Sequence, residues 1–442
     1  MKRVIRGWLI TFMLFLLVGG ITPALAENKL TLIYSGNLDG ELEPCGCSAE
    51  GNLGGIKRRA TMLSNLREEN PDMVVVSAGG LLSSDGPGDR LKGEYILKGY
   101  ATLQYDAVGV QWRDLVYGAD FILKESLPWV VSNWNSKTVP DYRVIKRAGQ
   151  KISFFNWLDP KKSPMRQMQG KHRLVDDSPT GLQEALQKAK QHGEITVLAT
   201  TLKAKQAVKV IGLANVDILI ERAAYEEYGQ PYMEGQTLVV QPGSRGMRLG
   251  RLDLEIKKGE KGEGKRGSIK KWHHKIIPMP ESVADAPELA AWYEEYNAKV
   301  KNDYLKRVEI NKTKKSGKSP YVGEEVCSTC HAAQHKLWSE SQHAIAYEDL
   351  EEVNKAFDPA CIGCHTVGFE KPGGFFDINA TGHLLGVQCE SCHGAGREHV
   401  EAAGKKPPPN AQWPREKVCG QCHIQKHSPG FNVETYWPKV AH

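Results

Sequence analysis

Eight of the ten cysteines in this 442-residue chain fall into four copies of one pattern, Cys-x-x-Cys-His. The residues of these copies are Cys327, Cys330 and His331; Cys361, Cys364 and His365; Cys389, Cys392 and His393; and Cys419, Cys422 and His423. This spacing is the attachment signal of c-type haem. Two thiols one turn apart can form thioethers with the two vinyl groups of a porphyrin, and the imidazole that follows can bind the iron.

A single copy of this pattern could instead form a disulfide or hold zinc. Four copies, each with histidine in the fifth position, favour haem over both alternatives. The sequence therefore predicts four covalently bound c-type haems between residues 320 and 442. The four motif histidines are the expected proximal ligands of the irons.

Six histidines of this region lie outside the motifs and could bind the opposite face of an iron. The expected distal ligands, in decreasing order of preference, are His343, His399, His383 and His427. We expect His335 on a helix surface, and His442, at the end of the chain, to be free. An iron with two histidines is saturated and transfers electrons, whereas a five-coordinate iron can bind a substrate.

The segments around the motifs resemble one cytochrome family. They read YVGEEVCSTCHAAQHKLWSESQHAIAY, CIGCHTVGF, GVQCESCHGAGREHV and CGQCH, between residues 320 and about 432. This order resembles the tetrahaem cytochromes that accept electrons in hydroxylamine oxidation. The resemblance implies mostly helix and coil around closely stacked haems, with His343 and His399 as distal ligands. It also allows one of the four haems to be five-coordinate.

The first three hundred residues have the pattern of a separate α/β domain. The predicted strands are residues 29–36, 72–80, 195–202, 216–221, 237–243 and 248–259. The first five are short apolar runs, and the last alternates as an exposed strand does. Apolar spacing over residues 60–70 predicts a helix between the first two strands. Strands that alternate with helices favour an α/β fold.

The order of short sequence motifs over residues 29–258 resembles that of the nucleotidase-type metallophosphoesterases, which implies an α/β sandwich. The segments that match the metal-binding words of that family are Gly36-Asn37-Leu38-Asp39-Gly40, Ser77-Ala78-Gly79-Gly80, Gln111-Trp112-Arg113-Asp114 and Glu221-Arg222-Ala223-Ala224. Most ligands of the family are missing there. Two-metal hydrolysis needs several hard ligands on both ions, so Asn37, Asp39 and Asp114 alone cannot hold them. We expect a scaffold without phosphoesterase activity.

One loop of this domain carries the other two cysteines. Cys45 and Cys47 lie in GELEPCGCSAEGNLGG, a stretch rich in glycine with proline and serine. They could form a strained, easily reduced disulfide, stay as free thiols, act as a redox couple or bind a soft metal. Similar loops occur in exported nucleotidase-like redox proteins fused to multihaem cytochromes in metal-reducing bacteria, and the architecture of this chain resembles that group.

The N-terminus has the pattern of an export signal. A basic start, an apolar run and Ala24-Leu25-Ala26 predict a signal peptide over residues 1–26. We expect a nucleotidase-like domain at 27–284, a helix and basic linker at 285–319, and the tetrahaem domain at 320–442. This arrangement favours a periplasmic or cell-surface protein without a transmembrane segment after cleavage.

The sequence thus favours an electron-transfer protein with four c-type haems rather than an enzyme. The expected partners are redox proteins, either other cytochromes or quinol-linked donors, with an outer-membrane electron conduit as a further site of association. A net charge of +6 over this length gives no indication of nucleic-acid binding. The alternative is a haem enzyme that acts on a small nitrogen or sulfur compound at a five-coordinate iron.

Overall fold

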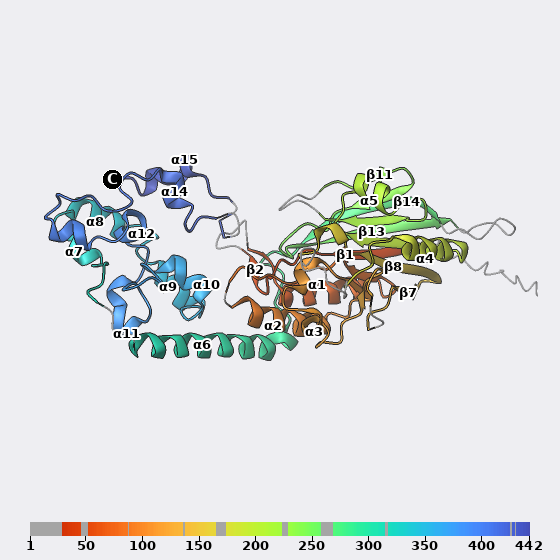
Figure 1. Cartoon of the computed structure of the whole chain (residues 1–442), viewed down its shortest axis with the longest axis horizontal. Helices are drawn as coiled ribbons and strands as arrows, with labels where there is room; N and C mark the ends of the chain where they lie inside the picture. Colours follow the sequence, from red (N-terminus) through yellow and green to blue (C-terminus); the bar gives the residue numbers. More distant parts are fainter. Residues whose placement is uncertain are drawn as a thin grey trace, which may run out of the picture.

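The computed structural model describes residues 29–45, 52–86, 88–135, 138–164, 174–222, 229–257, 268–313, 317–424, 427–428 and 430–442. The predicted signal peptide lies outside these residues. The sheets of the N-terminal region lie at one end of the molecule and short helices at the other, with the long helix α6 (Ala290–Thr313) running beside both (Figure 1). Among the described residues, no helix combines the length and the apolar character needed to cross a bilayer.

Two six-stranded sheets form the N-terminal region. The first contains β1 (Lys29–Ser35), β4 (Val74–Ser77), β5 (Ala107–Gly109), β6 (Trp129–Val130), β13 (Arg248–Lys257) and β14 (Ser268–Pro278). The second contains β7 (Tyr142–Arg147), β8 (Gln150–Trp157), β9 (Ile195–Thr200), β10 (Ile218–Glu221), β11 (Tyr232–Glu234) and β12 (Thr237–Val240). Their orders are β14-β13-β1-β4-β5-β6 and β11-β12-β10-β9-β8-β7. The predicted strands are therefore confirmed, with slightly different ends.

Alternate residues of a strand face opposite sides of its sheet, and this alternation builds the layers. In β1, Leu32 and Tyr34 join the core between the two sheets, whereas Ile33 joins the core on the outer face of the first sheet. That outer face is covered by α1 (Ile56–Glu69), α2 (Asp89–Thr102) and α3 (Ala119–Ile122). The outer face of the second sheet is covered by α4 (Thr180–Gln191) and α5 (Ala204–Val210). The result is the expected α/β sandwich.

Helix α6 belongs to the cores of both regions. Near its start Tyr296 is buried against the N-terminal core, and near its end Tyr304 and Val308 are buried in the core of the C-terminal region. Val300, between them, packs against both cores. The predicted connecting helix therefore holds the two regions in contact instead of acting as a loose tether.

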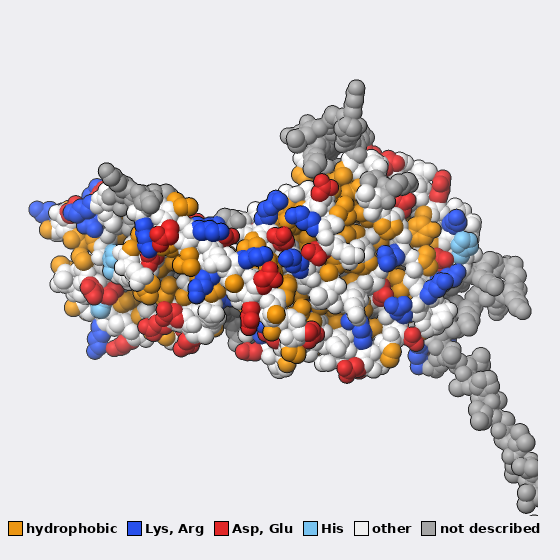
Figure 2. All heavy atoms as spheres, turned by 90° about the horizontal axis from the view of Figure 1, so that it is seen from below, with side chains coloured by type: hydrophobic (Ala, Val, Ile, Leu, Met, Phe, Trp, Pro, Cys, Tyr) orange, Lys and Arg blue, Asp and Glu red, His pale blue; other side chains and the backbone are white. Residues whose placement is uncertain are grey.

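The C-terminal region consists of short helices and coil. Its α-helices are α7 (Glu324–Ser328), α8 (Ala332–Ser339), α9 (Ala346–Glu352), α10 (Pro359–His365), α11 (Ile378–Thr381), α12 (Cys389–His393), α13 (Arg397–Glu401), α14 (Arg415–Cys419) and α15 (Val433–Tyr436). Its own apolar core is small and centres on Ile362, Phe375 and Leu384. On the face shown in Figure 2, acidic and basic side chains are interspersed over both regions.

Candidate functional site

The C-terminal region surrounds a cavity of about 2280 Å³. All eight motif cysteines and all four motif histidines line it. Sites for single small molecules have volumes of roughly 300–1,000 Å³. The cavity therefore has room for several large ligands, and the cysteines on its wall are where covalent attachment would occur.

Each motif forms about one helical turn, which places its sulfurs and its imidazole on one side of the backbone. In the first motif the His331 N–H donates to the Cys327 carbonyl over 2.9 Å, and the fourth motif repeats this bond between His423 and Cys419. The second and third motifs lie within α10 and α12. This is the geometry that attachment of two thioethers and one axial ligand requires.

Three of the motif histidines face a second imidazole across a gap. The ring centroids of His331 and His399 are 6.2 Å apart, and the planes differ by 22°. Those of His343 and His423 are also 6.2 Å apart. Two imidazoles that bind one metal ion from opposite sides have centroids about 6.2 Å apart, since each metal–nitrogen bond is about 2.0–2.1 Å. The centroid spacing of both pairs matches the spacing of two imidazoles bound to one iron.

The third pair involves a residue that the sequence did not favour. His442 lies 5.8 Å from His393, measured between ring centroids, although we expected this terminal histidine to be free. Its position at the end of the chain was a poor reason to exclude it. The number of irons could not have pointed to it, because four other histidines already match the four expected irons.

Hydrogen bonds orient the imidazoles toward the cavity. The Nδ1 atom of His399 bonds the Lys406 carbonyl at 2.7 Å, and that of His442 bonds the Val440 carbonyl at 3.0 Å. His365 makes the same kind of bond to the carbonyl of Ala346. A carbonyl only accepts, so Nδ1 carries the proton and the Nε2 lone pair is left for a metal. The donor set therefore fits an iron porphyrin.

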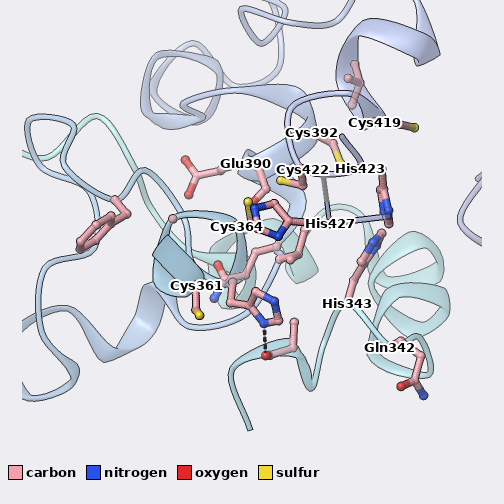
Figure 3. Close-up of a pocket in the computed structure, with 18 of the residues that line it drawn as sticks. Gln342, His343, Cys361, Cys364, Glu390, Cys392, Cys419, Cys422, His423 and His427 are labelled. Carbon is pink, nitrogen blue, oxygen red and sulfur yellow. Dashed lines mark hydrogen bonds between the residues drawn. The ribbon is translucent and has the colours of Figure 1, made fainter. Parts of the chain in front are cut away.

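The remaining candidates differ in position. His427 lines the cavity, and Figure 3 shows it close to Cys364 and Cys422. His383 does not line the cavity; its carbonyl and ring edge pack against Gly323. His335 also lines the cavity, and its ring pairs with Glu324 at the start of α7.

Contacts between motifs give their order in space. The thiols of Cys327 and Cys389 share a hydrogen bond, which lowers the pKa of Cys389 to about 7. The thiols of Cys364 and Cys422 share another, which lowers the pKa of Cys364 to about 7. The first motif thus lies beside the third and the second beside the fourth.

The imidazoles form the same two groups. The pKa of His393 is lowered by burial and then by His442, His331 and His399, so these four rings are neighbours. The pKa values of His343 and His423 are also lowered by burial and by a neighbouring imidazole. A lowered pKa favours the neutral imidazole, which is the form that binds a metal.

The N-terminal region fills its corresponding site with its own side chains. Gln111 donates from Nε2 to the Asn37 amide oxygen over 2.8 Å and to the Ala78 carbonyl over 3.2 Å. A side chain at Gly80 would collide with it, since an added Cβ would lie 2.8 Å from Nε2. Gln111 therefore occupies the space that a side chain at position 80 would need.

The charges at this site are also paired within the protein. Arg113 forms an ion pair with Asp39, and burial followed by nearby Arg222 lowers the Arg113 pKa. Asp114 is fully buried, which raises its pKa, while backbone N–H groups of Gly80 and Leu81 donate to it. Within the described residues, no group of three or more histidine, cysteine or acidic side chains is arranged to hold a metal ion.

The two regions meet beside the second haem motif. Lys355 is 8% exposed, and its Nζ lies 2.8 Å from Glu43 Oε1 and 2.9 Å from Asn297 Oδ1. These partners come from the N-terminal region and from α6. Glu43 and Pro44 also line the large cavity.

This contact lies next to the loop with the other two cysteines. Cys45 ends the two-residue strand β2 (Pro44–Cys45), which pairs with β3 (Leu53–Gly54). Cys47 and the side chain of Cys45 lie outside the described residues, so their predicted redox or metal role stays a prediction.

Comparison with known proteins separates the chain into the same two regions. Residues 326–394 match the family model for cytochrome c554 and c-prime. Cytochrome c-554 of Nitrosomonas europaea is 35% identical over 137 residues, which is 24% of this chain and 58% of that protein. The C-terminal region is thus similar to a c-type cytochrome, and the chain spans less than two thirds of that relative.

The N-terminal region has the fold of the nucleotidase-like phosphoesterases. A Thermus thermophilus sulfate thiohydrolase SoxB superposes with a TM-score of 0.52 at 15% identity, covering 61% of this chain and 60% of that one. A 5'-nucleotidase precursor, also from Thermus thermophilus, gives 0.51 at 16% identity, covering 62% and 59%. At these identities the likeness shows the fold alone, and it confirms the predicted fold class.

Proposed function

We propose that this protein is an electron-transfer protein that carries four c-type haems in its C-terminal region. The single observation that carries the proposal is the spacing of the facing imidazoles, 6.2 Å in two pairs and 5.8 Å in a third, around a cavity lined by all four attachment motifs. The similarity to cytochrome c-554 supports it independently. Haem supplies the one-electron chemistry, and the protein's residues hold, orient and separate the four groups.

From the three imidazole pairs we propose distal ligands for three of the haems. His399 would bind the iron of the first motif, His343 that of the fourth and His442 that of the third. For the second motif, whose histidine is His365, we propose His427 on the basis of its place in the cavity. His383 is the less suitable candidate, because it does not line the cavity.

We propose a route for electrons from the contacts between the motifs. The first and third haems would be neighbours, as would the second and fourth, because Cys327 lies near Cys389 and Cys364 lies near Cys422. The third and fourth motifs are also near each other, at Cys392 and Cys419. Electrons would therefore pass in the spatial order first, third, fourth, second. The second haem would be at one end of this order, because its motif follows Lys355 and Asp358 at the contact with Glu43.

An alternative function is a haem enzyme acting on a small nitrogen or sulfur compound. It is favoured by His365, because its Nδ1 contacts the Ala346 carbonyl and its imidazole neighbour, His343, is the ring that pairs with His423. If that iron were five-coordinate, carbon monoxide or nitrite would change the absorption spectrum of the reduced protein. Saturated irons would give no change.

The N-terminal region is proposed to be a docking and positioning scaffold without hydrolase activity. Its former site is filled by Gln111 and by the ion pair of Arg113 with Asp39. The proposed division is a signal peptide at 1–26, this domain at 27–284, a connecting helix and linker at 285–319, and the tetrahaem domain at 320–442. The proposed location is the periplasm or cell surface, with redox proteins or an outer-membrane conduit as partners.

A redox titration followed by electron paramagnetic resonance tests the proposal. We expect the mass of the mature protein to include four haems, and the low-spin signals of irons with two histidines to disappear on reduction. Fewer than four haems, or high-spin signals from most of them, would contradict the electron-transfer assignment. The same sample tests the alternative function through the binding of carbon monoxide.

A further inference from the structure

Glu390 is a buried carboxylate in the wall of the large cavity. It lies between the two cysteines of the third motif, Cys389 and Cys392, and is 4% exposed. In Figure 3 its carboxylate points away from the labelled cysteines. A carboxylate in such a position costs free energy unless its charge is balanced by hydrogen bonds or by a cation.

Backbone N–H groups from two other segments bind this carboxylate. Val322 and Gly323 donate to Oε2 over 3.0 and 2.9 Å, and Gly396 donates to Oε1 over 2.6 Å. Such N–H groups stabilise the ionised form of a carboxylate. All of the hydrogen bonds that Glu390 receives from the described residues are of this uncharged kind, so its net charge of minus one stays in the wall.

Glycine makes this close approach feasible. Gly323 has φ +81, a conformation that favours glycine, and an added Cβ at Gly396 would lie 3.2 Å from Oε1 of Glu390. The three segments held together are the approach to the first motif, the third motif itself and the start of α13, which carries His399. The carboxylate thus lies close to the first and third motifs.

The field of this charge acts on its neighbours. The pKa of Tyr321 is raised by burial and then by Glu390. Inside a protein a charge is screened far less than in water, so it also acts on other groups nearby. A fixed negative charge stabilises the ferric form of a haem, which has one more positive charge than the ferrous form.

We propose that Glu390 lowers the reduction potentials of the haems on the first and third motifs. The inference deepens the proposed function, since it concerns the same haems. Each reduction adds one electron from a redox partner to a ferric iron, with no bond made or broken at Glu390. The carboxylate is therefore a tuning group in the relay and not a catalytic residue.

The test is a spectroscopic redox titration of the full-length holoprotein and its Glu390→Gln variant. We expect one haem to become at least about tenfold easier to reduce, a change of ~59 mV for one electron, with a smaller rise for a second haem. Glu390→Asp, which keeps the charge, should restore most of the original potentials. Glu398→Gln is the matched control, because that exposed glutamate lies next to His399 and its charge is screened by water.

The low-spin resonance signals separate tuning from positioning. If Glu390 only held the three segments in place, both Glu390 variants would change the signals of the irons, and the potentials would not follow the charge. Unchanged potentials in a Glu390→Gln protein with four haems would overturn the proposal. Absence of haem from the wild-type protein would instead refute the proposed function.

A second measurement covers a Glu390→Gln variant that fails to assemble. Wild-type protein labelled with carbon-13 at glutamate carboxyl groups would be examined by infrared spectroscopy in its oxidised and reduced forms. We expect the labelled infrared band of an ionised carboxylate to shift on reduction. No band of a protonated carboxyl group should appear in either state. No glutamate carboxylate band that responds to reduction would overturn the proposal.

Discussion

The N-terminal region closes its former site with Gln111, Arg113 and Asp39, whereas the C-terminal region surrounds a cavity of about 2280 Å³. The first has three large cores in and around its two sheets, and the second has one small core beside α6. A site filled by the protein's own side chains leaves a stable scaffold. A wall of cysteines and histidines around a large space instead indicates a fold that depends on what fills it.

The largest expected difference between the regions appears when haem is not attached. Without the four porphyrins the C-terminal region lacks the apolar groups that would fill its cavity, so residues 317–442 should be digested rapidly by protease. Residues 29–278, with complete cores, should resist. Limited proteolysis with mass spectrometry measures this, and equal resistance of both regions would show that the cavity does not need haem for stability.

The next effect concerns a single iron. His399→Ala should convert the haem of the first motif from low-spin to high-spin and allow it to bind carbon monoxide, because the facing imidazole is removed. His335→Ala is the matched control, since that ring pairs with Glu324 at the start of α7. Spectra of the two variants that are indistinguishable would exclude His399 as a ligand.

A smaller effect is expected at the contact between the regions. Lys355→Met leaves the partly buried Glu43 without its cation. Removing one partner of a fully buried pair costs about 3–5 kcal/mol, and the partial exposure of Glu43 reduces this, so the free energy of unfolding should fall by roughly 2–3 kcal/mol. Lys306→Met, in an exposed pair with Asp303, should change it by less than about 1 kcal/mol. Similar losses of free energy of unfolding in both variants would mean that the contact between the regions stabilises the protein no more than an exposed ion pair does.

The last prediction is that the N-terminal region does not hydrolyse nucleotides. Nucleotide hydrolysis with added manganese or zinc should not exceed the uncatalysed rate, since Gln111 fills the space at Gly80 and bonds Asn37. A nucleotidase assayed in parallel shows that the conditions support turnover. Robust hydrolysis by this protein, lost in an Asp39→Asn variant, would reverse the interpretation of the N-terminal region.

The sequence predicted the features that depend on local pattern. Strands such as β1 and β9 followed from apolar runs, and the attachment sites from a five-residue motif. It could not predict features that arise when distant segments meet. His442 reaches His393 from the far end of the region, and Gln111 fills the space at Gly80 only because the strands bring them together. The roles of Cys45 and Cys47 stay predictions.

The length of α6 has a consequence for how such chains can change. An α-helix advances by about 100° per residue, so one residue inserted in its middle would rotate the haems by that angle around the helix axis. Tyr296 and Tyr304, buried on either side of its middle, could not then both keep their neighbours. Insertions and deletions should therefore be tolerated in surface loops but not within this helix. The number of residues in α6 sets the rotation of the C-terminal region relative to the N-terminal region.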